Sequence, residues 1–345
     1  MKTSILLLLS FTLAISSCVN GTQEVTPPVR YWDLPTGSHI AYEHVPADDL
    51  TASTPLIFVH GGPGACQVGV FGKEAPVAWY YGLAEHQFDI YIYDQVGSGL
   101  SARLADPRQY SVARHVADLE CIRVLAGNKP CILIGDSWGA TLVSHYMARY
   151  PQNVVKAILT APGGIDLRDW NEEFSPVPRF PLGWYEWIKD RYGEDRLKRY
   201  VELDNLMQKN IQQAYAFAGD RELDALADEF ISAVIFKNCV YHQKFVGHPD
   251  FRMRGMGFWA MAMTIWDLMN LNTKPVKDAL RSNEIPVLIL RGDADYLPPG
   301  IADEYNTICP NSTLIRIPRC GHFIWLDQPE IYSKSIESFL MADAK

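Results

Sequence analysis

Short apolar runs that alternate with helical stretches are the feature of this chain that most restricts its fold. The runs are rich in β-branched or aromatic side chains, as in strands that are buried on both faces. Helical patterns at 111–125 and 140–150 lie between them, which is the alternation of a parallel sheet with helices on both faces. We expect strands at 56–59, 88–93, 131–134, 154–160, 287–290 and 314–317, preceded by an N-terminal β-hairpin at 29–34 and 39–44.

The alternation stops between residues 164 and 284. Charged residues are interleaved there with Trp, Tyr, Met and Leu, as in 184–200 and 258–271, which is typical of amphipathic helices. We therefore predict an inserted helical lid at 164–284 and a core that is made of 29–163 and 285–345. The expected fold class is α/β, with a mostly parallel central sheet flanked by helices and a lid inserted into it.

The pentapeptide Gly135-Asp136-Ser137-Trp138-Gly139 stands between the expected strand 131–134 and the expected helix 140–150. A Gly-x-Ser-x-Gly turn at a strand-to-helix junction forces the serine into a strained conformation and lifts its hydroxyl clear of the sheet. Ser137 is therefore the candidate nucleophile. The carboxylate of Asp136 could meet a substrate ammonium group or bond backbone in the turn, and the second interpretation is favoured.

A serine hydroxyl needs a base, and the base needs a carboxylate that orients it. His322 follows the last expected strand and is the candidate base. The acid is expected after the strand 287–290, where Asp293 and Asp295 compete. Asp295 is farther past the strand end and just before Pro298, at the tip of the loop, so it is preferred and Asp293 is interpreted as a turn residue or a helix cap.

Two backbone donors are expected to bind the oxyanion of a tetrahedral intermediate. Trp138 follows the nucleophile and would supply one N–H group. The loop His60-Gly61-Gly62-Pro63-Gly64 follows the strand 56–59 and would supply the other, from Gly62 in the first instance. A further glycine pattern, at 94–101, lacks both Gly-x-Gly-x-x-Gly and a Walker lysine, and we interpret it as a tight crossover that borders the active site.

The N-terminus is predicted to be a targeting segment. Lys2 precedes an apolar run at 5–15, which is too short to span a bilayer and has the length of a signal-peptide core. Ile15-Ser16-Ser17-Cys18 resembles a bacterial lipobox, so 1–18 is predicted to be a lipoprotein signal peptide, with Cys18 lipidated and 19–28 as a tether. We expect an exported protein that a lipid anchor holds at the membrane; cleavage by general signal peptidase, which gives a periplasmic or secreted protein, is the alternative.

Composition excludes some functions. The net charge of −9 and the absence of a Lys/Arg cluster argue against a nucleic-acid partner. The histidines and the seven cysteines lack metal-site spacing, so neither a metal nor a cofactor is expected. Without Cys18 six cysteines remain, which permits disulfides without specifying them, although the expected strand between Cys309 and Cys320 argues against that pair.

These motifs together resemble the proline iminopeptidase branch of the α/β-hydrolase superfamily. The resemblance rests on the glycine loop at 60–64, the Asp-Gln loop at 94–101, Gly135-x-Ser137-Trp138-Gly139, Gly292-x-x-Asp295 and Gly321-His322, in an order and spacing that match from about 30 to 341. It implies a serine hydrolase that removes an N-terminal residue, often proline, through an acyl-enzyme. It also implies that acidic lid residues bind the free amino terminus of the substrate, and it supports Asp295 as the acid.

The lid departs from that family. Many members carry Trp-x-x-Trp-Glu there, whereas this chain has Trp184-Tyr185-Glu186-Trp187, and Val96 replaces an arginine of the Asp-Gln loop. Glu172, Glu173, Glu186 and Asp267 are candidate amine binders, although a charged helix residue usually only faces solvent. From the resemblance, a small peptide or amino-acid amide is still the first expected substrate. An ester or lactone on the same triad is the second interpretation, and a surface-anchored binding protein without catalysis is the third.

Overall fold

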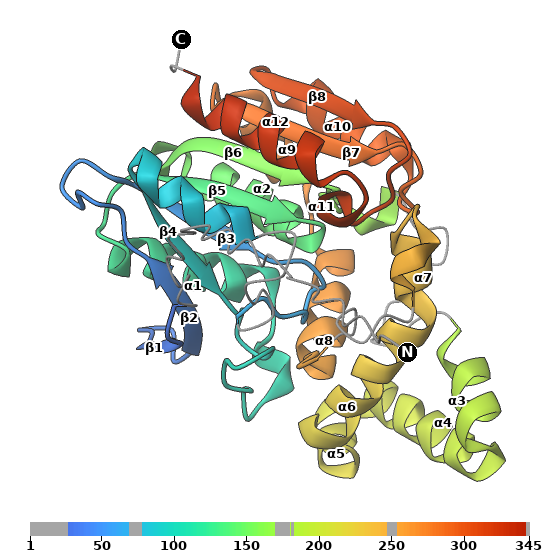
Figure 1. Cartoon of the computed structure of the whole chain (residues 1–345). Coiled ribbons are helices and arrows are strands. Elements are labelled where there is room, and N and C mark those ends of the chain that lie inside the picture. Colours follow the sequence, from blue (N-terminus) through green and yellow to red (C-terminus); the bar gives the residue numbers. More distant parts are fainter. Residues whose placement is uncertain (1–26, 69–77, 170–179, 181–182, 247–253, 343–345) are drawn as a thin grey trace, which may run out of the picture.

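The computed structural model describes residues 27–68, 78–169, 180, 183–246 and 254–342, and Figure 1 shows their arrangement. The predicted signal peptide, Cys18 and most of the tether lie outside these residues. One sheet of eight strands runs through the protein in the order β1-β2-β4-β3-β5-β6-β7-β8. Its strands are β1 (Arg30–Asp33), β2 (His39–Val45), β3 (Thr54–Val59), β4 (Phe88–Tyr93), β5 (Cys131–Asp136), β6 (Val154–Thr160), β7 (Val287–Gly292) and β8 (Ser312–Ile317).

The sheet is parallel from β4 to β8, and the hairpin β1–β2 joins it antiparallel to β4. The prediction of a mostly parallel sheet flanked by helices is confirmed. The α-helices are α1 (Val112–Leu125), α2 (Trp138–Arg149), α3 (Trp184–Tyr192), α4 (Glu194–Lys209), α5 (Ile211–Phe217), α6 (Asp220–Phe230), α7 (Phe236–Cys239), α8 (Phe258–Asn270), α9 (Lys274–Arg281), α10 (Pro299–Ile308), α11 (Ile324–Asp327) and α12 (Pro329–Met341).

Side chains of each central strand point alternately into two hydrophobic clusters, one on each face of the sheet. In β5, Leu133 belongs to the cluster that contains side chains of α1 and α2, whereas Ile132 and Ile134 belong to the cluster that contains side chains of α12 and of the 3₁₀ helix η1 (Ala78–His86). Burial on both faces explains why these strands read as continuous apolar runs rather than alternating ones. The parallel pairing from β5 to β8 places the C-terminal ends of β5, β7 and β8 at one edge of the sheet.

Every element that the structure describes between β6 and β7 is helical. These are α3 to α9, with a π-helical turn (Ile231–Ile235) and the short 3₁₀ helices η4 (Leu167–Asp169) and η6 (Gln243–Phe245). Figure 1 shows α3 to α6 grouped beyond the sheet, and α8 between them and the core. Helix α9, within the segment that we predicted as the lid, packs against α2 beside the sheet. The lid and core boundaries remain a prediction.

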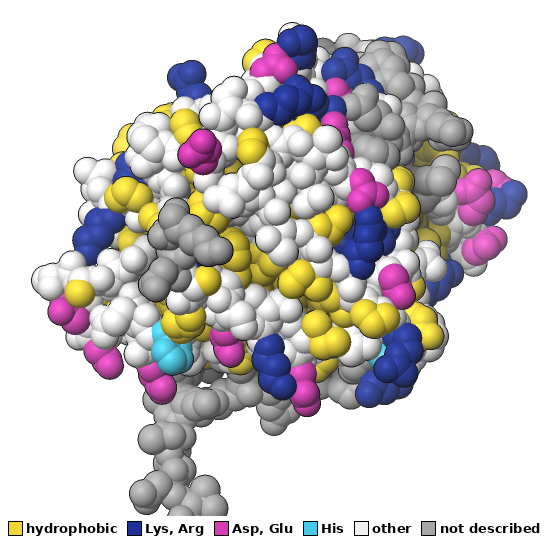
Figure 2. All heavy atoms as spheres, turned by 90° about the horizontal axis from the view of Figure 1, so that it is seen from above, with side chains coloured by type: hydrophobic (Ala, Val, Ile, Leu, Met, Phe, Trp, Pro, Cys, Tyr) yellow, Lys and Arg dark blue, Asp and Glu magenta, His cyan; other side chains and the backbone are white. Residues whose placement is uncertain are grey.

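Hydrophobic, acidic and basic side chains are mixed on the face shown in Figure 2, and the Lys and Arg side chains there do not gather into one patch. Among the residues that the structure describes, no helix is long and apolar enough to cross a membrane.

Candidate active site

Ser137 occupies a strained turn between β5 and α2. Its φ of 54° and ψ of −117° lie in a region that non-glycine residues rarely adopt, at a cost of about 1–3 kcal/mol. The turn is held from both sides, because the N–H of Ser137 donates to the carbonyl of Thr160 (2.9 Å) and its carbonyl accepts from the N–H of Gly163 (2.9 Å). The neighbouring strand thus imposes the conformation that the Gly-x-Ser-x-Gly pattern predicts.

Glycine at 139 brings the start of α2 against the end of β3. A Cβ atom at this position would lie 1.9 Å from the carbonyl oxygen of Val59, so no side chain fits. The glycine loop begins directly after Val59, and Gly62 within it has a φ of 114°, which favours glycine. The close approach therefore places the loop beside Ser137 and Trp138.

Ser137, Gly62 and Trp138 line one cavity of about 250 Å³. The sequence-predicted nucleophile and both predicted oxyanion donors are thus brought together. Other lining groups are Thr141, Gly163 and Tyr296, and much of the remaining wall is apolar. It consists of Pro63, Leu167, Ile265, Leu268, Leu297, Pro298 and Ile301. Such a cavity suits a small, largely apolar group that a few polar atoms orient.

His322 and Asp295 form a buried pair in the loops that follow β8 and β7. The Nδ1 atom of His322 lies 3.0 and 3.1 Å from the two carboxylate oxygens of Asp295, and the side chains are only 4% and 1% exposed. An N–H at Nδ1 donates to the carboxylate, which leaves Nε2 as the basic nitrogen. The ring of His322 also contacts Tyr296, with centroids 4.9 Å apart, and Tyr296 is one of the residues that line the serine cavity.

Two opposed effects set the ionisation of this pair. Burial alone would lower the pKa of His322, but the charge and hydrogen bond of Asp295, with a smaller contribution from the charge of Asp136, outweigh it and raise that pKa above its usual value. Burial would likewise raise the pKa of Asp295, yet His322 holds it below its usual value. The pair therefore favours imidazolium beside carboxylate, which is the charge state that a base reaches after it takes a proton.

The structure separates the two candidate aspartates. Asp295 accepts from the N–H of Leu297 (3.0 Å) and contacts His322, whereas Asp293 accepts from the N–H of Cys320 (3.4 Å). Buried Arg291 supports the acid loop, because its guanidinium donates to the carbonyl of Leu297 (2.6 Å). Of the two residues, only Asp295 lies against the imidazole, as the position in the loop predicts.

Gln95 is a residue of the site that sequence reasoning did not identify. Its side-chain oxygen accepts from the indole N–H of Trp138 (2.9 Å), and its side-chain nitrogen donates to the carbonyl of His60 (2.8 Å). One amide thus joins the two segments that carry the predicted oxyanion donors. Burial lowers the pKa of His60 to about 4, so this histidine is neutral and accepts from the N–H of Gln95 (2.9 Å). The Asp-Gln pattern was visible in the sequence, but its partner became apparent only in the fold.

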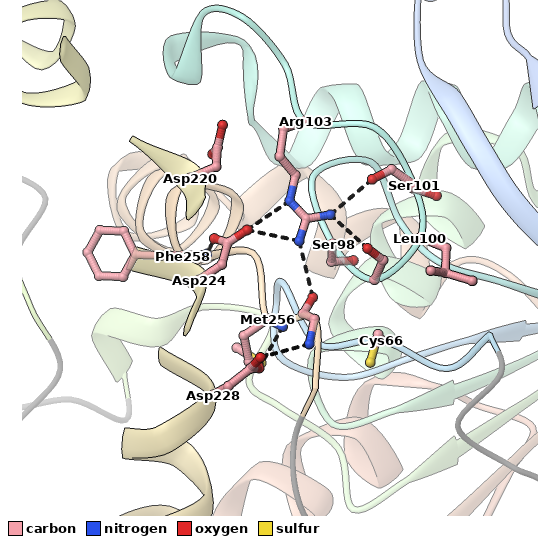
Figure 3. A network of polar contacts seen from close by, with 12 residues as sticks. Cys66, Ser98, Leu100, Ser101, Arg103, Asp220, Asp224, Asp228, Met256 and Phe258 are labelled. Atoms are coloured by element: carbon pink, nitrogen blue, oxygen red, sulfur yellow. Dashed lines mark hydrogen bonds and ion pairs between the residues drawn. The ribbon is translucent and has the colours of Figure 1, made fainter. Parts of the chain in front are cut away.

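An ionic network joins α6 to the loop after β4, as Figure 3 shows. Arg103 contacts the carboxylate of Asp224 through Nε (3.0 Å) and a terminal nitrogen (2.9 Å), and it also donates to the carbonyls of Gly99 and Ser101. Asp228, one helical turn further, accepts from the N–H groups of Gly255 and Met256. Burial raises the pKa of Asp224 to about 6, although Arg103 opposes it. The network fixes the segment that leads into α8, whose side chains line the cavity.

The lid carboxylates that we considered as amine binders do not gather at the cavity. Asp267 accepts from the N–H of Val112 (2.8 Å) at the start of α1, and Glu186 is exposed. Glu172 and Glu173 lie outside the described residues. The structure therefore assigns no described lid carboxylate to substrate binding.

The six cysteines within the described part of the chain are all free thiols, Cys309 and Cys320 among them. No cluster of three or more His, Cys, Asp or Glu side chains suited to a metal occurs among the described residues.

Comparison with known proteins agrees with this geometry. Residues 54–199 match the family model described as the alpha/beta hydrolase fold. The chain is 24% identical over 305 residues to the proline iminopeptidase of Heyndrickxia coagulans. The match covers 88% of this chain and 96% of that protein. It is also 24% identical over 316 residues to the human (lyso)-N-acylphosphatidylethanolamine lipase, covering 89% of this chain and 85% of the relative. The resemblance to proline iminopeptidases is thus confirmed over most of the length.

Solved structures show the same fold. A thermophilic esterase from Thermogutta terrifontis superimposes with a TM-score of 0.57 at 18% identity, over 91% of this chain and 98% of the esterase. An esterase from Exiguobacterium antarcticum gives a TM-score of 0.55 at 16% identity, over 90% of this chain and 99% of the esterase.

Proposed function

We infer that this chain, which has the α/β-hydrolase fold, is a serine hydrolase that works through an acyl-enzyme with Ser137 as nucleophile, His322 as base and Asp295 as orienting acid. The observation that carries the proposal is the strained Ser137 in one cavity with Gly62 and Trp138, together with a buried His322–Asp295 pair that contacts the cavity residue Tyr296. Strain of this kind persists only where the surrounding structure imposes it, and it is typical of active sites.

In the proposed mechanism His322 first accepts the hydroxyl proton of Ser137 and then donates it to the leaving group. Nε2 of His322 takes the hydroxyl proton while Oγ of Ser137 attacks the substrate carbonyl carbon. The N–H groups of Gly62 and Trp138 would then stabilise the oxyanion, and one such donor typically contributes on the order of 3–4 kcal/mol. The imidazolium returns its proton to the departing amine or alcohol as the carbon bond to it breaks. Water, activated by the same histidine, adds to the acyl carbon and releases the acid and Ser137.

The leading substrate class is a peptide or amino-acid amide with a proline-type N-terminal residue. The support for it is the resemblance to proline iminopeptidases over about nine-tenths of the chain. The cavity of about 250 Å³ is of a size that accepts a small cyclic or aliphatic acyl group.

A second candidate is an esterase or lactonase on the same triad. The observation that favours it is the apolar cavity wall, in which no carboxylate lies among the described lining residues. A carboxylate would bind the free amine of an aminopeptidase substrate, whereas an acyl ester needs no such partner.

A substrate panel separates the two candidates. Prolyl and other aminoacyl arylamides are compared with N-blocked prolyl arylamide and with short acyl esters, using wild type and Ser137→Ala. The peptidase proposal expects turnover of the free aminoacyl arylamides that blocking the amine abolishes. Activity confined to esters would overturn it and support the second candidate.

We also propose, from the lipobox-like Ile15-Ser16-Ser17-Cys18, that the mature protein is exported and held at a membrane by acylation of Cys18. Mass spectrometry of the mature N-terminus tests this. A diacylglyceryl group on Cys18 that Cys18→Ala abolishes is expected, and an unmodified mature chain in the soluble fraction would contradict the proposal.

A further inference from the structure

Two carboxylates that stand close in the chain to proposed catalytic residues have no part in the mechanism above. Asp136 precedes Ser137, and its Oδ1 atom accepts from the hydroxyl of Thr160 on the neighbouring strand (2.8 Å). The favoured sequence interpretation, a bond to backbone in the turn, is therefore wrong for this oxygen. Asp327 ends α11, the short helix that follows His322 in the chain, and its side chain is buried.

The carboxylate of Asp327 binds backbone N–H groups from two separate segments. Its Oδ2 atom accepts from Gly321 (2.8 Å), which directly precedes His322, and from Tyr241 (2.7 Å). Its Oδ1 atom accepts from His242 (2.9 Å). Tyr241 and His242 follow α7 and belong to the segment that we predicted as the lid. Hydrogen bonds to an ionised carboxylate are stronger than neutral ones, so one side chain joins the His322 loop firmly to the lid segment.

The residue on the other side of His322 binds the same segment. The N–H of Phe323 donates to the carbonyl of Cys239 (2.9 Å), the last residue of α7, and its ring meets the ring of Phe236 edge-on with centroids 5.2 Å apart. Gly321 permits this approach, because a Cβ atom there would lie 2.6 Å from the carbonyl oxygen of Cys239. Figure 1 shows α7 extending from the group of α3 to α6 towards the core. Both chain neighbours of His322 are thus fixed to the lid segment.

The imidazole of His322 needs this support because it is carried by a loop. Asp295 binds Nδ1 and fixes the rotation of the ring, but the position of the ring also depends on the backbone of 321–323. A misplacement of about 1 Å between reacting groups can cost about 100-fold in rate. The contacts of Gly321 and Phe323 with the lid segment therefore affect how well Nε2 can reach the proposed nucleophile.

We propose that Asp327 is a positioning residue of the active site, which fixes the backbone of His322 by binding the loop of that residue to the lid segment at Tyr241 and His242. The proposal rests on the role assigned to His322 above. The lid segment then has a second task besides covering the cavity, because its backbone is part of the support for the base.

The test follows the Nδ1 proton of His322, which donates to Asp295, by NMR in wild type, Asp327→Asn and Asp327→Ala. An amide has one acceptor oxygen, so Asp327→Asn keeps the size of the side chain but loses at least one of the bonds to backbone, and Asp327→Ala loses all of them. The proposal expects exchange of this proton with water to be at least about tenfold faster in Asp327→Asn and faster still in Asp327→Ala. With substrate, kcat should fall by about 10–100-fold while KM stays nearly unchanged.

Asp228→Asn is the matched control. Asp228 also binds backbone N–H groups within the predicted lid, those of Gly255 and Met256 (2.9 and 2.8 Å), so its replacement weakens bonds of the same kind at another place. It should leave the exchange of the His322 proton unchanged.

Wild-type exchange in both Asp327 variants would overturn the proposal. Equal acceleration in Asp228→Asn would do so as well, because it would indicate a general loosening of the lid, and so would a kinetic effect confined to KM. If Asp327→Ala does not fold, the comparison of Asp327→Asn with Asp228→Asn decides. The NMR measurement needs neither substrate nor a reactive Ser137, so its outcome is distinct from a failure of the proposed function.

Discussion

The ion pair between Arg103 and Asp224 gives the sharpest stability prediction for the contact between the core and α6. The two side chains are only 20% and 14% exposed, and the guanidinium also donates to three backbone carbonyls. Arg103→Met fills a similar volume but leaves the Asp224 charge buried with the N–H of Phe258 as its remaining donor. Removing one partner of a buried pair costs about 3–5 kcal/mol, and partial exposure places the expected loss near the lower limit.

The measurement is urea and thermal unfolding at pH 8, well above the pKa of about 6 that Asp224 has in the wild type, because loss of Arg103 removes the charge that opposes the burial-driven rise in that pKa. A loss of about 3 kcal/mol in the free energy of unfolding corresponds to a fall in Tm of roughly 4 °C for a chain of 345 residues. Asp224→Asn in the same background should restore part of the loss, because it removes the uncompensated charge.

Arg108→Met is the matched control. Arg108 pairs with Asp106 in the same connection between β4 and α1, but its side chain is 54% exposed, so its loss should leave the free energy of unfolding nearly unchanged. Equal effects of Arg103→Met and Arg108→Met would refute the reasoning. A double variant whose loss equals the sum of its two single losses would refute it as well, because the charges would then act independently.

The remaining predictions concern the proposed site. Ser137→Ala and His322→Ala should each lower kcat by about 10⁵-fold or more without a change in fold, measured by steady-state kinetics and circular dichroism. Asp295→Asn should cost about 10³–10⁴-fold and Asp293→Asn much less; the reverse order would contradict the choice of acid. Because Asp295 raises the pKa of His322 and only neutral imidazole accepts the proton, kcat/KM should fall with decreasing pH through a value above about 6.5; a midpoint below that value would contradict it. Gly139→Ala should destabilise the protein by at least about 2 kcal/mol in urea, since its Cβ would meet the carbonyl of Val59; wild-type stability would contradict the close approach.

The sheet was predictable because its strands are buried on both faces and are therefore continuously apolar. The exact ends of the strands were less predictable. β5 and β7 run two residues beyond the apolar runs, to Asp136 and Gly292, because ladder pairing with neighbouring strands continues where the apolar pattern has ended. The helical stretch at 184–200 belongs to two helices, α3 and α4. Gly193 lies between them with a φ of 84°, which interrupts the helical conformation.

The residues of the candidate site were predictable where both the residue type and the strand that it follows indicate one chemical role. Ser137, Asp295 and His322 follow three different strands, and the parallel order brings those strand ends to one edge. Contacts between distant residues that belong to no such motif were not predictable. Gln95 bonds Trp138 across 43 positions, and no periodicity or spacing marks such a partner in a single sequence.

The most direct measurement of the central claim is active-site labelling. The purified protein is treated with a fluorophosphonate probe, and the modified residue is located by peptide mass spectrometry in wild type, Ser137→Ala and His322→Ala. We expect one adduct on Ser137, none in Ser137→Ala, and strongly slowed labelling in His322→Ala, because the hydroxyl needs its base. Hydrolytic activity with no adduct on Ser137, or an adduct on another residue that survives Ser137→Ala, would contradict the account.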